Sequence, residues 1–454
     1  MQISRLALRA ATLLAAALGV TSAPSDATRN RVLVVLNAAS ERAQYSTYLA
    51  DLEGRGFAVT VKGAEEVAAL VAFEELAFHH LVMLNDNKSG SALAATKVVD
   101  FVNRGGNVIL AASSKVSEAI RDVGIELSAD FDEKGNAVFD AFNSVDIDGD
   151  GKPENAVVRV SRVVGDTVII PPSLKEAIKS GSSPLVFKGV GHRLTGKNPL
   201  IAPLIQGNPT SFSYLESTKG KTAPSASAIV GHNLVLVSAL QARNNARVVF
   251  SGSVELFSNQ FFDLIIESKR TSNREFASEL TKWVFQEKGV LAVRKTYHHR
   301  PTETQQHGSY RIKEDVVYVI EISDYHSNKW HPYKSTTPVQ FYAKMLDPYV
   351  RQNMTLASVS DTSATYTLPF LTPDVYGVFT FGVEHKRREG YSWIDVHENV
   401  NIHPFRHDEY PRFLSAAYPY YVNVFSMMAG FVVLSAVVLY NKEVLPASDK
   451  VKKE

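Results

Sequence analysis

No cysteine occurs anywhere in the 454 residues of this sequence. Its absence excludes disulfide bonds, thiolate metal sites and cysteine nucleophiles together. A surplus of one charge is also lacking, because 48 Lys and Arg residues nearly balance 47 Asp and Glu residues. Nucleic-acid binding therefore has no electrostatic support. The 45% of hydrophobic residues is enough to bury ordinary cores, and the length predicts two or three domains.

Recognisable catalytic motifs are scarce as well. The sequence has no G-x-S-x-G nucleophile elbow. The run from Gly191 to Lys197 has the G-x-x-x-x-G-K spacing of a phosphate-binding loop, but Asn198 and Pro199 follow in place of a Ser or Thr and a helix. A turn is the better interpretation of this run, and we expect neither a catalytic residue nor a cofactor.

The histidines offer little metal chemistry. His403 and His407 have the i, i+4 spacing of paired zinc ligands, but a proline lies between them and no glutamate follows the first. The run His298, His299, Arg300 predicts an exposed linker turn and not a catalytic cluster.

One acidic segment deserves comparison with a calcium loop. Asp146, Asp148 and Asp150, with Gly151, form a D-x-D-x-D-G start, in which alternate carboxylates can converge on a hard cation. The twelfth position is Val157, so the bidentate glutamate is missing. We interpret the segment as a polar surface turn and keep the three aspartates as a weak metal candidate.

The C-terminal end predicts a membrane helix. An uncharged stretch runs from Phe413 to Asn441, and residues 419–440 can cross a hydrocarbon core of about 30 Å as a helix. The lysines that follow outnumber the preceding arginines, which predicts a cytosolic tail at 441–454. Lys450 and Lys452 in that tail fit the K-x-K-x-x retrieval signal of endoplasmic reticulum membrane proteins.

The N-terminal end predicts a signal peptide at 1–23. Arg5 and Arg9 precede an apolar run, and small residues follow it. The two ends together predict a single-pass type I protein of the endoplasmic reticulum membrane, with the bulk of the chain in the lumen.

Residues 28–288 alternate short apolar runs with amphipathic segments. This βαβ rhythm predicts an α/β domain with a mostly parallel sheet and helices on both faces. The predicted strands are 32–36, 57–61, 81–84, 108–111, 156–160, 234–240 and 247–250, with helical segments around 45–52, 98–102 and 276–285. Polar residues at strand ends (Asn37, 85–87, 113–114) lie where open α/β folds usually bind ligands.

Residues 289–410 lose the helical rhythm, and their short β-rich runs predict a β-sandwich. The runs are 315–322, 339–345, 355–360, 363–368, 375–383 and 391–397.

Two further kinds of site follow from short patterns. Asn87 and Asn353 begin N-x-S/T sequons, which are glycosylation acceptors if they are exposed in the lumen. In the predicted membrane helix, Asn423, Ser426 and Gly430 fall on one face. We expect this stripe to contact another membrane helix, and a lone anchor is the open alternative.

Several longer strings carry a resemblance to a known family. They are LQARNNARV at 240–248, FSGS at 250–253, WVF at 283–285, GVL at 289–291, DPYVR at 347–351, PDVYGVF at 373–379, YPRF at 410–413, AYPYY at 417–421 and FSMM at 425–428. Through them, and over most of 31–440, the chain resembles the 48 kDa subunit of the endoplasmic reticulum oligosaccharyltransferase. The segments 61–95 and 145–184 depart from the family pattern.

The resemblance implies a non-catalytic, structural subunit of the complex that transfers a preassembled oligosaccharide from dolichol diphosphate to asparagine in N-x-S/T sequons. It implies an α/β head that looks like a Rossmann-like glutamine-amidotransferase relative without the cysteine. It also implies ribophorin II, the defender-against-death subunit and the catalytic subunit as partners. The alternative is a stand-alone type I luminal binding protein, such as a cargo or glycan receptor, and a luminal hydrolase comes third.

Overall fold

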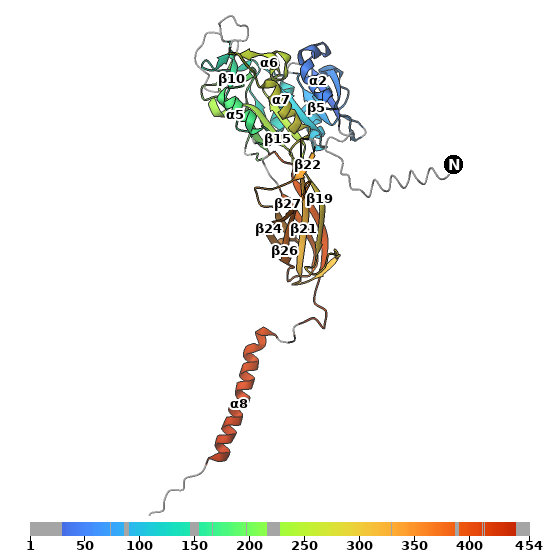
Figure 1. Cartoon of the computed structure of the whole chain (residues 1–454), viewed down its shortest axis with the longest axis vertical. Coiled ribbons are helices and arrows are strands. Elements are labelled where there is room, and N and C mark those ends of the chain that lie inside the picture. The colour runs from blue at the N-terminus through green and yellow to red at the C-terminus, as the bar shows by residue number, and fades with distance from the viewer. Residues whose placement is uncertain are drawn as a thin grey trace, which may run out of the picture.

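The computed structural model describes residues 30–72, 74–85, 90–145, 154–165, 167–196, 198–215, 228–327, 329–385, 390–410, 412 and 414–441. Figure 1 shows two β-containing bodies in succession, with a long helix beyond the second. We call residues 30–288 the first body and residues 289–410 the second body.

The first body is built on a nine-stranded mixed sheet. Its path is β2 (Ala58–Gly63), β1 (Arg31–Leu36), β5 (His80–Met83), β6 (Asn107–Ala111), β16 (Arg247–Ser251), β15 (Val235–Gln241), β12 (His192–Leu194) and β7 (Ala129–Phe131), and β13 (Ile201–Gln206) pairs with β15. The strands from β2 to β16 pair in parallel, whereas β15, β12, β7 and β13 pair antiparallel.

Helices cover both faces of this sheet, because strand β1 is apolar on both sides. Val32 and Val34 join one hydrophobic core, and Leu33 and Val35 join the other. The helices on the first face are α2 (Ser46–Gly54) and α7 (Asn273–Val284), and those on the second are α3 (Ala95–Asn103) and α4 (Glu118–Glu126). The continuous apolar run of β1 thus accounts for the layered arrangement.

Shorter elements complete the first body. They are η1 (Ala39–Tyr45), η2 (Ala64–Glu66), β3 (Val71–Ala72), β4 (Glu75–Leu76), η3 (Ser91–Leu93), β8 (Asn136–Phe139), β9 (Ser144–Val145), β10 (Glu154–Val160), α5 (Pro172–Ser180), β11 (Leu185–Phe187), β14 (Phe212–Leu215), η5 (Gly231–Asn233), η6 (Glu255–Phe257), α6 (Asn259–Asp263), β17 (Ile265–Ile266) and β18 (Lys269–Arg270).

The second body contains two five-stranded sheets. One has β19 (Val290–His299), β21 (Asp315–His326), β26 (Ala364–Leu371) and β25 (Thr355–Val359), with β22 (Lys329–Pro332) on β21; the other has β20 (Ser309–Arg311), β28 (Ile394–His403), β27 (Gly377–His385), β23 (Gln340–Lys344) and β24 (Pro348–Asn353). The rings of Tyr318 and Phe341, one from each sheet, lie 4.7 Å apart in a shared core. The two sheets therefore pack face to face.

A single long apolar helix follows. After η7 (Ser415–Ala417), α8 spans Tyr418–Tyr440, and the segment Ser415–Tyr440 has a mean hydropathy of 2.2 with none of its most apolar part buried. Its length and composition suit a membrane span. The prediction of a sheet-containing chain with an apolar helix near its C-terminal end is confirmed. The predicted mostly parallel sheet of the first body is instead mixed, because β15, β12, β7 and β13 pair antiparallel.

The prediction for His298 and His299 is wrong. Both belong to β19, and His298 is 1% exposed. Polar residues in sequence suggested an exposed linker, but His298 can be buried because it has a hydrogen-bond partner inside the second body. Its Nδ1 lies 2.7 Å from the hydroxyl of Tyr310.

Candidate functional site

The carboxyl edge of the parallel strands is largely filled by the chain itself. Asn85 is fully buried, and so are Ser251 and Ser253 at the end of β16. The Ser251 hydroxyl donates to the Ser253 carbonyl at 3.0 Å. A Cβ on Gly252 would lie 1.7 Å from the carbonyl oxygen of Val190, so the backbones at these two residues are in close contact. This part of the edge therefore offers no room for a ligand.

Metal chemistry finds no support in the residues that the structure describes. Among them, no group of three or more His, Asp or Glu is placed to hold a metal ion. His403 ends β28, and its Nδ1 lies 3.0 Å from the Pro404 carbonyl oxygen. Asp146, Asp148 and Asp150 lie outside the described residues.

One serine and histidine pair escaped the sequence analysis. His192 Nε2 and Ser238 Oγ lie 2.7 Å apart on the neighbouring strands β12 and β15. Both residues have zero exposure, and burial lowers the pKa of His192 to about 3. No substrate can reach this pair, so it is part of the core and not a nucleophile with its base.

The joint between the two bodies is centred on Arg247, the first residue of β16, which is fully buried. Its Nη1 donates to the carbonyl oxygens of Trp283 at 2.6 Å and Lys288 at 2.8 Å. Its Nη2 donates to those of Gly289 at 2.6 Å and Gly390 at 3.4 Å. One guanidinium thus donates hydrogen bonds to carbonyls of both bodies, because its planar group carries N–H donors that point in several directions.

Trp283, near the end of α7, supports the same joint. Its indole nitrogen donates to the Gly390 carbonyl at 2.7 Å, and its ring lies 4.8 Å from the Arg247 guanidinium carbon. The hydrogen bond to Gly390 fixes the loop before β28 against the first body, and the ring contact holds Trp283 beside Arg247.

The turn between β15 and β16 holds the other side of that loop. Asn245 accepts a hydrogen bond from the Trp393 backbone nitrogen at 2.7 Å and donates to the Trp393 carbonyl at 3.2 Å. Gln241 donates to the Tyr391 carbonyl at 2.8 Å. Asn245 has a φ of 66°, which asparagine tolerates better than most residues. The LQARNNARV string, together with Trp283 and Lys288, therefore forms the first body's side of the joint.

Electrostatics at the joint follow from burial. Burial lowers the pKa of Arg247 to about 9, and the Asp324 carboxylate of β21 opposes the shift. Burial raises the pKa of Asp324, while His326 opposes that shift from 3.3 Å. Arg247 still carries its charge at neutral pH, so its carbonyl contacts are charge-assisted hydrogen bonds.

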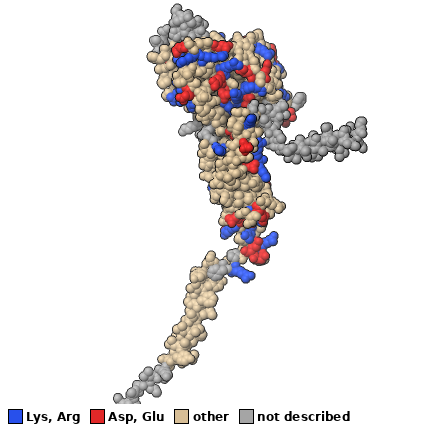
Figure 2. Space-filling view, viewed as in Figure 1, with Lys and Arg blue, Asp and Glu red and all other residues tan. Residues whose placement is uncertain are grey.

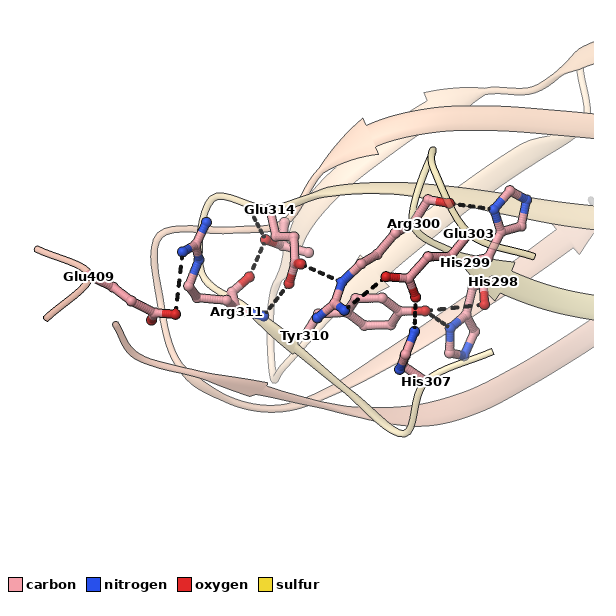
Figure 3. Close-up of polar contacts among 10 residues, drawn as sticks. His298, His299, Arg300, Glu303, His307, Tyr310, Arg311, Glu314 and Glu409 are labelled. Carbon is pink, nitrogen blue, oxygen red and sulfur yellow. Dashed lines mark hydrogen bonds and ion pairs between the residues drawn. The ribbon is translucent and has the colours of Figure 1, made fainter. Parts of the chain in front are cut away.

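A second polar cluster lies at the end of the second body from which the chain leaves toward α8 (Figure 3). Arg300 Nε donates to Glu314 Oε1 at 2.6 Å, and Glu303 Oε2 contacts His307 Nε2 at 2.5 Å. The His307 contact lowers the pKa of Glu303. Burial lowers the pKa of His298. These side chains pair with one another, so the cluster organises a turn and presents no catalytic arrangement.

The same cluster holds the segment that leads to α8. Arg311 Nη1 lies 3.6 Å from Glu409 Oε1, and its guanidinium carbon lies 5.0 Å from the ring centroid of Phe405. The ring of Phe405 is 5.4 Å from that of Tyr410. Residues 405–410 therefore stay in contact with the end of the second body.

The remaining predicted sites fall into two groups. Asn353 ends the exposed edge strand β24, and Asn423, Ser426 and Gly430 are exposed along α8. Within α8, the Ser426 hydroxyl donates to the Asn423 carbonyl at 2.8 Å, and a Cβ on Gly430 would meet nothing within 4 Å. Outside the described residues lie the signal peptide 1–23, Asn87, and Lys450 and Lys452 of the tail.

The features described so far are two β-containing bodies joined at a buried contact and followed, among the described residues, by one long apolar helix. The family model described as "OST48, N-terminal domain" matches residues 23–287, and the one described as "OST48 middle domain" matches residues 298–442. The chain therefore belongs to the OST48 family.

Curated relatives agree with this assignment. A protein from Arabidopsis thaliana named dolichyl-diphosphooligosaccharide–protein glycosyltransferase 48 kDa subunit is 35% identical, over 91% of this chain and 94% of its own length. Relatives of the same name from Caenorhabditis elegans and Danio rerio are 35% and 34% identical, over 95% of this chain and 95% and 96% of their own lengths. These names do not favour the alternative of a stand-alone receptor.

Similarity to solved structures is low. A β-glucosidase from Listeria innocua matches with a TM-score of 0.18 and 8% identity, over 84% of this chain and 46% of that chain.

Proposed function

We propose that the chain is a non-catalytic, structural subunit of an oligosaccharyltransferase, needed for assembly of the complex that glycosylates N-x-S/T sequons. The names of its relatives support the complex, and the joint at Arg247 carries the structural role. The four carbonyls bound by one buried cation hold two bodies in a fixed relation, as a scaffold requires.

A non-catalytic role agrees with the chemistry of the described residues. The buried pair of His192 and Ser238 is inaccessible, and the paired side chains around Arg300 and Glu303 are mutually satisfied. Catalysis by the complex would then belong to another subunit.

In this proposal, the finer architecture is an amidotransferase-like, Rossmann-like luminal domain at 28–288 and a luminal β-sandwich at 289–410. Residues 1–23 would be a signal peptide, 419–440 the transmembrane helix and 441–454 the cytosolic tail. The protein would reside in the endoplasmic reticulum membrane as a single-pass type I protein, with Lys450 and Lys452 as the retrieval signal.

The proposed partners are ribophorin II, the defender-against-death subunit and the catalytic subunit. The stripe of Asn423, Ser426 and Gly430 on α8 supports one contact, because polar and small residues on one helical face favour packing in lipid.

Two measurements on the full chain test the proposal. Depletion of the protein should lower sequon occupancy on reporter glycoproteins, and the purified chain alone should transfer no glycan from a lipid-linked donor to an acceptor peptide. Transfer by the chain alone would contradict a non-catalytic role, and unchanged occupancy after depletion would contradict membership in the working complex.

A further inference from the structure

The end of the second body where β28 finishes is held close to the start of α8. Glu409 is tied back to Arg311, and an extended chain from Glu409 to Ser415 reaches at most about 20 Å. If α8 spans a bilayer, as the proposed function has it, this end of the second body must lie near the membrane surface.

Large apolar side chains are exposed at the same end. Leu346 is 100% exposed, Tyr376 65%, Val378 61%, Leu371 53% and Tyr349 48%. We call these five residues the apolar end surface. Strand pairing places Leu346, Tyr349 and Val378 at one end of their sheet, because β27 begins at Gly377 and pairs with β23, and the turn from β23 to β24 holds Leu346. Tyr376 directly precedes β27, and Leu371 ends β26 at the same end of the facing sheet, where Asp315 begins β21.

The two loops that carry this surface touch each other. A Cβ built on Gly377, whose φ is 147°, would lie 2.6 Å from the Met345 sulfur. Position 377 therefore needs glycine, which brings the loop of Tyr376 against the turn of Leu346.

Leu346 itself has a φ of 87°, an uncommon conformation for a residue with a side chain. The neighbouring turn imposes it, since the Met345 nitrogen donates to the Asp347 carbonyl at 3.1 Å. The fully exposed side chain of Leu346 buries no apolar surface inside this chain. Strained backbone conformations of this kind cluster at functional sites.

We propose that the apolar end surface inserts into the interfacial layer of a phospholipid bilayer. This insertion would set the distance and the orientation of the second body relative to the membrane surface. Tyrosine and leucine suit that layer, because aromatic and apolar side chains partition to the headgroup boundary. Lys344 flanks the surface and is exposed, so it complements a phosphate group, whereas the neighbouring Lys313 is paired with Asp374 at 2.8 Å.

The absence of cysteine makes the test direct, since any introduced cysteine is the single labelling site. The full-length chain is placed in phosphatidylcholine nanodiscs with an environment-sensitive fluorophore at Leu346→Cys or Tyr376→Cys. Two reference positions are Val433→Cys in α8 and Val359→Cys, which is 46% exposed at the opposite end of the second body. The readout is quenching by lipids that carry a nitroxide near the headgroup.

Labels at positions 346 and 376 should be quenched well above the label at position 359, and their emission should shift to the blue. The substitution Leu346→Asp should remove the quenching at position 376, whereas Leu356→Asp, on the exposed strand β25, should not.

Absent quenching at 346 and 376, with position 433 quenched, would overturn the inference and leave the membrane span intact. Absent quenching at 433 would overturn the span and the inference together. If labels at 346 and 376 were shielded only in the purified complex, with no quenching by lipid, another subunit would be the occupant and the inference would fall.

Discussion

The indole nitrogen of Trp283 donates a hydrogen bond of 2.7 Å to the carbonyl oxygen of Gly390, across 107 positions of sequence. This bond joins the last long helix of the first body to a loop of the second. Together with the guanidinium of Arg247, whose Nη1 and Nη2 donate to four carbonyls, it makes the joint a buried, hydrogen-bonded contact and not a flexible linker.

Replacing the buried arginine should loosen the joint. Arg247→Met should lower the free energy of unfolding by about 3 kcal/mol, because the carbonyls that it satisfies would be left buried and unpaired. Thermal unfolding of the detergent-solubilised chain measures the change. The matched control Arg42→Met removes a surface ion pair with 59% and 50% exposed partners and should change little. Equal effects of the two substitutions would contradict the role of Arg247.

His192 should make stability depend on pH. Burial lowers its folded pKa from 6.5 to about 3, so below pH 6.5 the unfolded chain binds one more proton than the folded chain. Stability should therefore fall as the pH drops from 6.5 toward 3. His192→Gln should make that slope shallower by at most about 1.4 kcal/mol per pH unit. Denaturant unfolding between these pH values measures the slope, and His397→Gln, at an exposed site, should leave it unchanged.

The stripe on α8 should matter for assembly. Gly430→Leu adds bulk where two helix backbones could approach, and Asn423→Leu removes the amide. Weakened co-purification of other subunits in mild detergent is the expected result, while Val432→Leu, on a different face of α8, should have no effect. Unchanged assembly in the double variant would make α8 a simple anchor.

Asn353 should report the side of the membrane on which the second body lies. It is exposed on β24, with its side-chain oxygen 3.1 Å from Gln340 Nε2, so a glycan can be accommodated outside the core. Asn353→Gln and Thr355→Ala should each remove one endoglycosidase-sensitive mobility shift, whereas Thr355→Ser should retain it. The absence of any shift that depends on Asn353 would contradict its use as an acceptor.

The tail lysines Lys450 and Lys452 should act as an endoplasmic reticulum retrieval signal. Lys450→Ser with Lys452→Ser should weaken retrieval when the tail is fused to a reporter, since the K-x-K-x-x spacing is lost. Substitution of Lys453 alone should leave the reporter in the endoplasmic reticulum. Retention of the reporter after the double substitution would contradict this reading of the tail.

Local pattern was enough for much of the first body. The apolar run of β1 and the amphipathic face of α7, which buries Phe276 and Leu280, are visible in short windows of sequence. Predicted boundaries lie within a few residues of the observed ones, as for the strand at 247–250 against Arg247–Ser251.

Features that depend on distant partners could not be predicted. Strand β19 reads as polar after Val293, and only its pairing with β21 and the contact of His298 with Tyr310 make it a buried strand. The importance of Arg247 was equally hidden, because an arginine at the start of a strand is usually exposed. Its partners at 289 and 390 are remote in sequence, and no periodicity links them.

The separation between Trp283 and Gly390 also imposes an order of events on the ribosome. At about 5–20 residues per second, synthesis of the 107 residues from 284 to 390 takes on the order of 5–20 s. During that interval the nascent first body is complete in sequence, yet the loop that caps Arg247 has not emerged. The joint can therefore close only after residue 390 has left the ribosome, when the first body and most strands of the second body have already been synthesised.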